Sequence, residues 1–111
     1  MSTRYLNHEK RRKQILSAAV DISKQFSYLT LTFNQVAKRV KCTRGLIIHH
    51  FGSMAALRDA VMIHAVATND LLLIAQGLAH GNPIATTANE DIKKQSVREL
   101  LTGVDDDSRG I

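Results

Sequence analysis

The stretch LTFNQVAKRVKCTRGLIIHHF, Leu31 to Phe51, determines the fold that we expect for this chain. Thr32 can cap the free amides of a helix, and Gln35 three residues later completes a possible capping box. That helix carries an inward apolar stripe of Phe33, Val36, Ala37 and Val40. Thr43 can cap a second short helix, Arg44 to His50, which stops before a glycine. Two short helices joined by a tight turn predict a helix-turn-helix.

Helical patterns also surround this stretch. An amphipathic helix is predicted from His8 to Phe26, because apolar residues recur there at helical spacing: Ile15, Ala19, Ile22 and Phe26. A longer helix is predicted from Ser53 through Ala79, up to the sequence HGNP, and a last one from about Asn89 to Thr102. The predicted fold class is all-α, with a three-helix helix-turn-helix domain followed by a long fourth helix and a short fifth helix. We expect an N-terminal basic arm and DNA-binding domain over 1–52, a helical dimerisation region over 53–103, and a frayed polar tail over 104–111.

Basic residues are concentrated in the first half of the chain. The 111 residues carry a formal charge of +5. Residues 1–58 hold eleven lysines and arginines against Glu9 and Asp21, which gives +9, whereas residues 59–111 hold four against eight acidic residues, which gives −4. A polyanion is the natural partner of such a basic half. Nucleic acid fits better than a membrane surface, because no strongly apolar amphipathic stretch accompanies the basic cluster.

The second helix of a helix-turn-helix lies in the major groove, with its N-terminal residues at the base edges. Arg44 can donate to O6 and N7 of guanine, a contact worth about 1–3 kcal/mol of discrimination. Thr43 and the amides around it can hold a phosphate. Gly45 fits where a side chain would collide with DNA or with the preceding helix. These features predict that the start of this helix recognises base sequence.

The remainder of that helix divides into core and surface positions. Ile47 and Phe51, four residues apart, are the expected core anchors, which leaves Ile48 and His49 to face the groove and His50 to face the DNA backbone. The adjacent histidines suggest a metal site as an alternative, and ordinary exposed histidines as another. Their side chains diverge by about 100° on a helix, so chelation of one ion is disfavoured. We expect DNA-facing histidines and no metal.

The single cysteine, Cys42, excludes an intrachain disulfide and fits a reducing compartment. A nucleophilic role for it would require a positioned base and a pocket, and the sequence indicates neither. Paired carboxylates and nucleotide-binding loops are also missing from the sequence, so we expect no enzyme and no cofactor. The N-terminus has no apolar signal core, and polar residues interrupt the longest apolar region. We therefore expect a cytoplasmic protein that does not associate with membranes.

The predicted fourth helix is apolar on most of its sides. Asp70 is the only charged side chain between Asp59 and Glu90 when histidine is counted as neutral. A small chain cannot easily bury such a helix by itself, so we expect a homodimer. The alternative is an intramolecular core closed by the last helix. The predicted dimer interface consists of Met62, Val66, Leu71, Leu73, Ile74 and Leu78.

Residues 10–66 resemble the DNA-binding domain of tetracycline-repressor (TetR) family regulators. The resemblance is carried by ILSAAVDISKQF, LTFNQVAKRV, CTRGLIIHHF and GSMAALRDAV. It implies phosphate contacts at Thr32 and His50, and major-groove contacts at Thr43, Arg44, Gly45, Ile48 and His49. Two positions depart from the family pattern, because Ile48 replaces the usual aromatic residue and Met54 the usual lysine. We therefore expect the run Lys10 to Lys13 to contribute more of the backbone contacts. The full set of predicted DNA-binding residues is Lys10, Arg11, Arg12, Lys13, Thr32, Lys41, Thr43, Arg44, Gly45, Ile48, His49 and His50.

The region after about Ala67 is shorter than the ligand-binding and dimerisation domain of that family, so an inducer pocket of the usual kind is not expected. We predict a sequence-specific transcription regulator that binds double-stranded DNA as a homodimer. The alternative is a protein-protein interaction module whose apolar fourth helix engages polymerase or another regulator, with DNA contact secondary.

Overall fold

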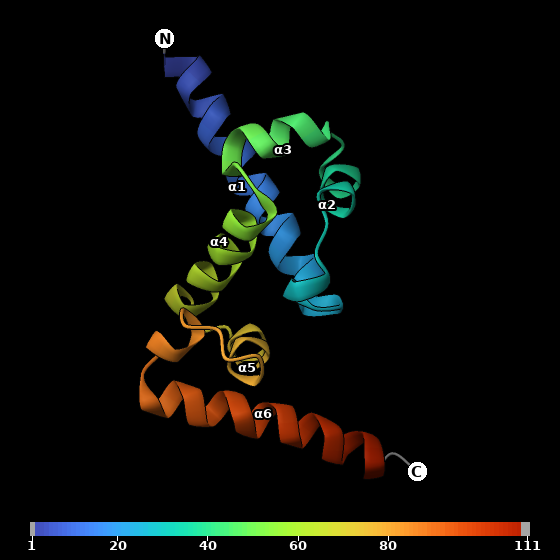
Figure 1. The fold of residues 1–111 in the computed structure, drawn as a ribbon, viewed down its shortest axis with the longest axis vertical. Helices are drawn as coiled ribbons and strands as arrows, with labels where there is room; N and C mark the ends of the chain where they lie inside the picture. Colours follow the sequence, from blue (N-terminus) through green and yellow to red (C-terminus); the bar gives the residue numbers. More distant parts are fainter. Residues whose placement is uncertain (1, 110–111) are drawn as a thin grey trace. The chain divides into compact units, whose positions relative to one another are not determined.

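The computed structural model describes residues 2–109, and the side chains of residues 7–101 among them. The described residues form six α-helices and two short 3-10 helices and contain no strand, which confirms the predicted all-α class (Figure 1). The elements are α1 (Ser2–Gln25), η1 (Tyr28–Thr30), α2 (Phe33–Val40), α3 (Arg44–Phe51), α4 (Met54–Ala67), α5 (Leu71–Ala79), η2 (Ala85–Thr87) and α6 (Glu90–Arg109). The chain divides into two compact units between Val61 and Met62, within α4.

The first unit contains α1, η1, α2, α3 and the first half of α4. Helix α2 packs against both α1 and α3, so the helix-turn-helix rests on the long first helix (Figure 1). Three of the four residues of the predicted stripe of α1 are buried. The core of the unit includes Ile15, Ala19, Ile22, Leu31, Val36, Ile47 and Leu57. Phe26 was expected in this core, but it is 67% exposed. The prediction was wrong because α1 ends at Gln25, so that Phe26 lies on the bend beyond the helix.

Local hydrogen bonds define the two short helices as predicted. The hydroxyl of Thr32 accepts a hydrogen bond from the Gln35 amide at 3.2 Å, and Gln35 Oε1 accepts one from the Thr32 amide at 2.8 Å. The Thr43 hydroxyl accepts from the Leu46 amide at 3.1 Å. Between the two helices Lys41 adopts a left-handed conformation, with φ 62°, and the chain turns sharply there. The capping box and the second cap thus fix where α2 and α3 begin.

The apolar region from 53 to 79 is two helices, not the single long helix that was predicted. Helix α4 ends at Ala67, and Asn69 adopts a left-handed conformation with φ 54°. Asp70 then begins α5, since its Oδ1 accepts a hydrogen bond from the Leu73 amide at 3.3 Å. Asparagine tolerates the left-handed region, and aspartate is a favoured N-cap, so these two polar residues stop one helix and start another.

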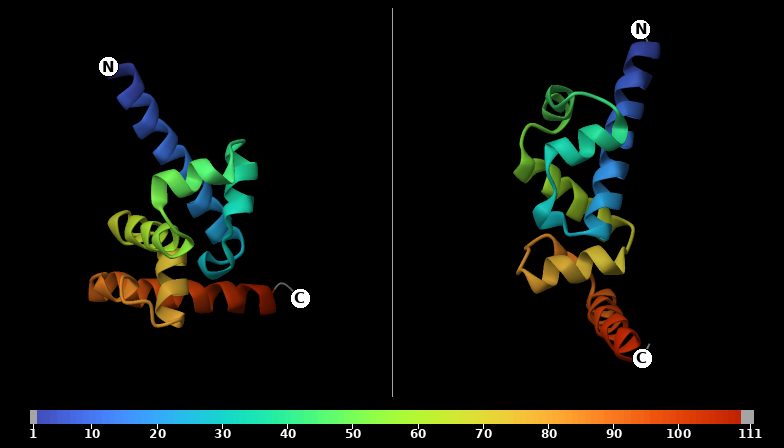
Figure 2. Two further views of the ribbon diagram at one scale, coloured as in Figure 1. Left: turned by 45° about the horizontal axis from the view of Figure 1, so that its top comes forward. Right: turned by 90° about the vertical axis from the view of Figure 1, so that its right-hand side faces the viewer.

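The second unit contains the rest of α4, α5, η2 and α6. Helices α5 and α6 pack together and cross each other (Figure 2). Gly81, with φ 67°, terminates the α5 region in the predicted HGNP turn. Helix α6 continues to Arg109, beyond the expected end at Thr102 and into the segment expected to be a frayed tail. Gly103 lowers helix propensity by about 1 kcal/mol but does not by itself end a helix. Residues 110–111 of the predicted tail lie outside the described residues.

Candidate nucleic-acid interface

Helix α3 presents one continuous face to the outside of the first unit. Ile47 is fully buried and anchors the helix, as predicted, whereas Ile48 is 38% exposed. Arg44, Gly45 and His49 are also exposed. Positions 44, 45, 48 and 49 fall on one side of a helix, so the structure brings the predicted groove-facing residues together on one face.

Gly45 lies on that exposed face with free space around it. A Cβ atom built there would lie 3.9 Å from Thr43 Oγ1 and would meet nothing else within 4 Å. The expected collision with the preceding helix was therefore wrong, because α2 does not approach this position. A side chain at residue 45 would therefore project from the exposed face of α3 and could contact a molecule bound against that face.

The side chain of Arg44 is held next to α2. Its guanidinium carbon lies 5.5 Å from the centroid of the Phe33 ring, within the range of a cation–π contact. Phe33 was expected only as part of the inward stripe, and it is half-buried. This contact places the guanidinium at the start of α3, where base edges or phosphates can reach it.

The C-terminal end of α3 is attached to α1 by two ring contacts. The His8 and His50 rings are 4.5 Å apart between centroids, and the guanidinium carbon of Arg12 lies 4.5 Å from the centroid of Phe51. His8 and Arg12 are one turn apart on α1, so both point to the same side of that helix. Arg12 therefore faces α3, while the rest of the predicted basic run does not share this contact.

Three imidazoles gather where α1 meets α3. The rings of His8 and His49 are 6.0 Å apart, and those of His49 and His50 are 5.6 Å apart. His50, expected to face the DNA backbone, is half-buried, and its Nδ1 is buried without a hydrogen-bond partner among the described residues. Desolvation, followed by the positive charges of His8, His49, Arg12 and Arg11, lowers the pKa of His50 below its ordinary value. This lowered pKa favours the neutral form of the His50 imidazole. Across the part of the chain that the structure describes, no group of three or more histidine, cysteine or acidic side chains could hold a metal ion.

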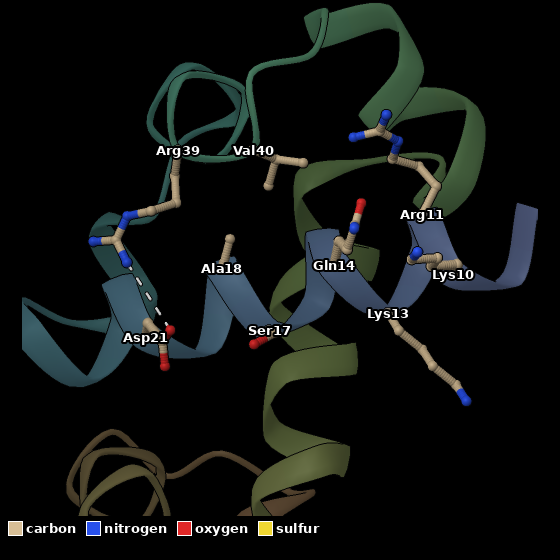
Figure 3. A pocket seen from close by; sticks show the side chains of 9 residues that line it. All are labelled: Lys10, Arg11, Lys13, Gln14, Ser17, Ala18, Asp21, Arg39 and Val40. Carbon is tan, nitrogen blue, oxygen red and sulfur yellow. Dashed lines mark ion pairs between the residues drawn. The ribbon is translucent and has the colours of Figure 1, made fainter. Parts of the chain in front are cut away.

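Three further basic residues of α1 line an open hollow beside α2. This hollow has a volume of about 650 Å³, and Lys10, Arg11 and Lys13 lie along one end of it (Figure 3). At the other end Arg39 of α2 forms an ion pair with Asp21, with 4.0 Å between Nη1 and Oδ2. None of the three α1 residues forms an ion pair with a described residue, so their charges are available to an external anion. The predicted basic arm is therefore a helical surface, because α1 already begins at Ser2.

The remaining predicted contact residues occupy the turn and the helix starts. Thr32 and Thr43 are exposed at the starts of α2 and α3, and Lys41 is exposed in the turn between them. Sequence reasoning missed His8. Its only signal in the sequence was the spacing of four residues from His8 to Arg12, which places both on the side of α1 that faces α3.

Within the described residues no single helix has the length and apolar character needed to cross a membrane. The consecutive helices at 44–51 and 54–68 would meet that test of length and composition as a pair, but they are bent by 65°.

Comparison with known proteins gives one family match. Residues 15–61 match the family described as bacterial regulatory proteins, tetR family. No curated protein and no solved structure matches the chain significantly. The matched segment runs from the buried stripe of α1 through the helix-turn-helix to the middle of α4, which is the unit that carries the exposed face of α3.

Proposed function

Because residues 15–61 match the family described as bacterial regulatory proteins, tetR family, we propose that this chain is a cytoplasmic transcription regulator that binds specific sequences in double-stranded DNA as a homodimer. The exposed face of α3 carries the proposal. It presents a guanidinium, a glycine, an aliphatic side chain and an imidazole on a helix whose opposite side carries the fully buried Ile47 and the half-buried Leu46, His50 and Phe51. A helix of this kind fits the major groove, where such groups can contact base edges.

Two sets of residues would make different contacts with DNA, one set with bases and the other with phosphates. We assign base recognition to Arg44, Ile48 and His49, with Gly45 allowing a close approach. Lys10, Arg11 and Lys13 would contact phosphates, since these positive charges have no partner among the described residues. Phosphate contacts supply affinity for any sequence and make binding salt-dependent, whereas base contacts supply specificity.

The proposed dimer surface differs from the predicted interface. Met62, Leu73 and Ile74 are fully buried in the single chain, so a partner could not contact them in this conformation. Val66, Leu71 and Leu78 are half-buried. Single exposed apolar side chains remain in α4 and α5, at Ile63 and Leu72, but three occur together on one side of α6, at Val97, Leu100 and Leu101, of which Leu101 is 59% exposed. Positions 97, 100 and 101 form a helical stripe, and we propose that a second copy covers it.

The dimer hypothesis can be tested by sedimentation velocity over a range of concentrations. Leu101→Glu should shift the chain toward the monomer, because it places a charge in the proposed interface. Gln95→Glu is the matched control, since it adds the same charge at an exposed position on the side of α6 away from this stripe. A parent chain that sediments as a monomer at every concentration would exclude the dimer.

DNA recognition can be tested by selecting binding sites from random DNA and then comparing a selected duplex with a scrambled one. Arg44→Ala should relax base preference at one position of each half-site, by about 1–3 kcal/mol. Lys13→Ala should weaken binding to both duplexes equally and reduce the salt slope by about 0.9 per subunit. A dimer of helix-turn-helix units should select half-sites about one helical turn apart. Equal loss on both duplexes for Arg44→Ala would contradict its assignment to bases.

A further inference from the structure

The connection between α1 and α2 presents two large apolar side chains on the surface of the first unit. Phe26 is 67% exposed, and Leu29, three residues later, is 40% exposed. Their neighbours Tyr28 and Leu31 are buried and belong to the core. Tyr28 and Leu31 therefore attach this connection to the core, and Phe26 and Leu29 are free to contact another molecule.

Local hydrogen bonds hold the connection in a defined conformation. The Phe26 amide donates to the Ile22 carbonyl at 3.0 Å, which extends the hydrogen-bonding pattern of α1 by one residue. The Leu29 amide donates to Ser27 Oγ at 3.1 Å, and the Thr30 amide donates to the Ser27 carbonyl at 3.3 Å. A partner would thus meet two apolar side chains on an ordered backbone, which reduces the entropy lost on binding.

Phe26 forms one wall of an open hollow between α1 and α2. The hollow has a volume of about 480 Å³ and is lined by Ile22, Phe26, Gln35, Lys38 and Arg39. Apolar walls with a few polar groups are typical of pockets that bind other molecules. The hollow can therefore receive an apolar side chain of a partner beside the Phe26 ring.

The polar side of the hollow is basic. Lys38 and Arg39 are exposed there, and Arg39 also lines a neighbouring hollow together with the exposed Lys24 and Asp21. Arg39 is paired with Asp21, and it donates a hydrogen bond to Gln25 Oε1 at 3.3 Å. Lys38 forms no ion pair with a described residue. Three positive charges next to one negative charge favour an acidic partner.

We propose that the Phe26 surface, consisting of Phe26, Leu29, Lys38 and Arg39, binds an acidic segment of a second protein. An aliphatic or aromatic side chain of that segment would occupy the hollow, and its carboxylates would face Lys38 and Arg39. A second copy of the same surface fits poorly, because it would bring like charges together. DNA would match the charges but not the two apolar side chains. The proposal does not depend on the proposed DNA-binding function.

The test begins with a displayed library of random peptides, selected on the immobilised full chain. The peptide that binds best is then synthesised, and its affinity is measured by fluorescence anisotropy. Selected peptides should be enriched in aspartate and glutamate next to an apolar residue. Phe26→Ala should weaken binding of this peptide by about thirtyfold, the loss typical of an aromatic residue truncated at the centre of an interface. Lys38→Gln should weaken it about threefold at low salt and less at high salt.

Two control variants match these changes. Ile63→Ala also truncates an exposed apolar side chain, since Ile63 is 57% exposed on α4. Gln95→Glu changes the net charge by the same amount as Lys38→Gln, at an exposed position of α6. Neither control should change the affinity for the peptide. Phe26→Ala should fold like its parent, as judged by circular dichroism, and should leave the affinity for a selected DNA duplex unchanged.

Several outcomes would overturn the proposal. These are a library that yields no binding peptide, selected peptides without acidic residues, and an affinity that Phe26→Ala leaves unchanged or lowers no more than Ile63→Ala does. An equal loss of peptide and DNA binding in Phe26→Ala would assign the surface to DNA instead. If Phe26→Ala does not fold, Lys38→Gln decides, and a loss no larger than that of Gln95→Glu overturns the proposal. A parent chain that binds the peptide but no DNA refutes only the DNA-binding function.

Discussion

Replacing Gly77 by alanine should destabilise the second unit, although alanine is the better helix former. A Cβ atom at this position would lie 2.5 Å from the Cβ of Ala85 and 3.0 Å from both Sδ and Cε of Met62. Carbon atoms in contact normally lie about 3.5–4.0 Å apart, so the first distance is short by roughly 1 Å. Met62 can move the end of its flexible side chain, but the Cβ of Ala85 is attached to the backbone, so η2 would have to shift.

The magnitude follows from two opposing effects. Overpacking of this kind costs about 1–3 kcal/mol, and the short contact with a backbone-attached atom places Gly77→Ala at the upper end. The higher helix propensity of alanine relative to glycine offsets about 1 kcal/mol of this cost. We expect a net loss of about 2 kcal/mol in the free energy of unfolding, and a melting temperature lower by on the order of 10 °C.

Thermal and urea unfolding followed by far-ultraviolet circular dichroism would measure this loss. Introducing Ala85→Gly removes the clashing atom, so Gly77→Ala should cost at least 1 kcal/mol less in that background, as a double-mutant cycle reports. The matched control is Gly45→Ala, whose Cβ enters open space and should stabilise the chain by about 0.5–1 kcal/mol. A Gly77→Ala chain as stable as its parent would refute the packing described for α5 and η2.

Three further predictions concern the first unit. Gly45→Ala should weaken DNA binding in electrophoretic mobility shifts while raising stability, because its methyl group projects from the exposed face of α3; unchanged affinity would show that DNA does not approach this position. Because the fold lowers the pKa of His50, the unfolded chain binds the proton more readily, so stability should be constant well above pH 6.5 and fall as the pH drops below it. This loss, measured by thermal unfolding, should be smaller in His50→Gln, and identical pH profiles would contradict the shift. Thr32→Ala should lose about 1 kcal/mol of stability by removing the cap of α2, whereas Thr32→Ser should retain most of it, and equal losses in urea unfolding would argue against the capping box.

The helix-turn-helix could be predicted because its signals are local. Thr32 and Thr43 each accept the hydrogen bond that their position in the sequence suggested, and a cap acts within three residues of itself. The break at Asn69 and Asp70 was missed, although both are turn and cap residues. Apolar residues continue on either side of them, and in a region apolar on most sides the pattern is equally compatible with one helix or two.

The same ambiguity affected the residues predicted for the dimer interface. Met62 and Leu73 lie in the core of their own chain, and a helix that is apolar all round gives no sign of whether its cover comes from the same chain or another. The exposed face of α3 was predictable from helical spacing alone. The approach of His8 to His50 depends on how α1 and α3 pack, which spacing within one helix does not determine.

The attachment of α1 to the end of α3 has a consequence for how binding preference can evolve. His8 and Arg12 lie on the helix whose lysines and arginines are assigned to phosphates, yet their partners His50 and Phe51 belong to the helix assigned to bases. A substitution that tilts α1 would therefore also tilt the recognition helix. Under the function proposed above, general affinity for DNA and choice of target sequence would therefore be coupled, and variants selected for tighter binding at residues 8 or 12 should also change in the sequences they prefer.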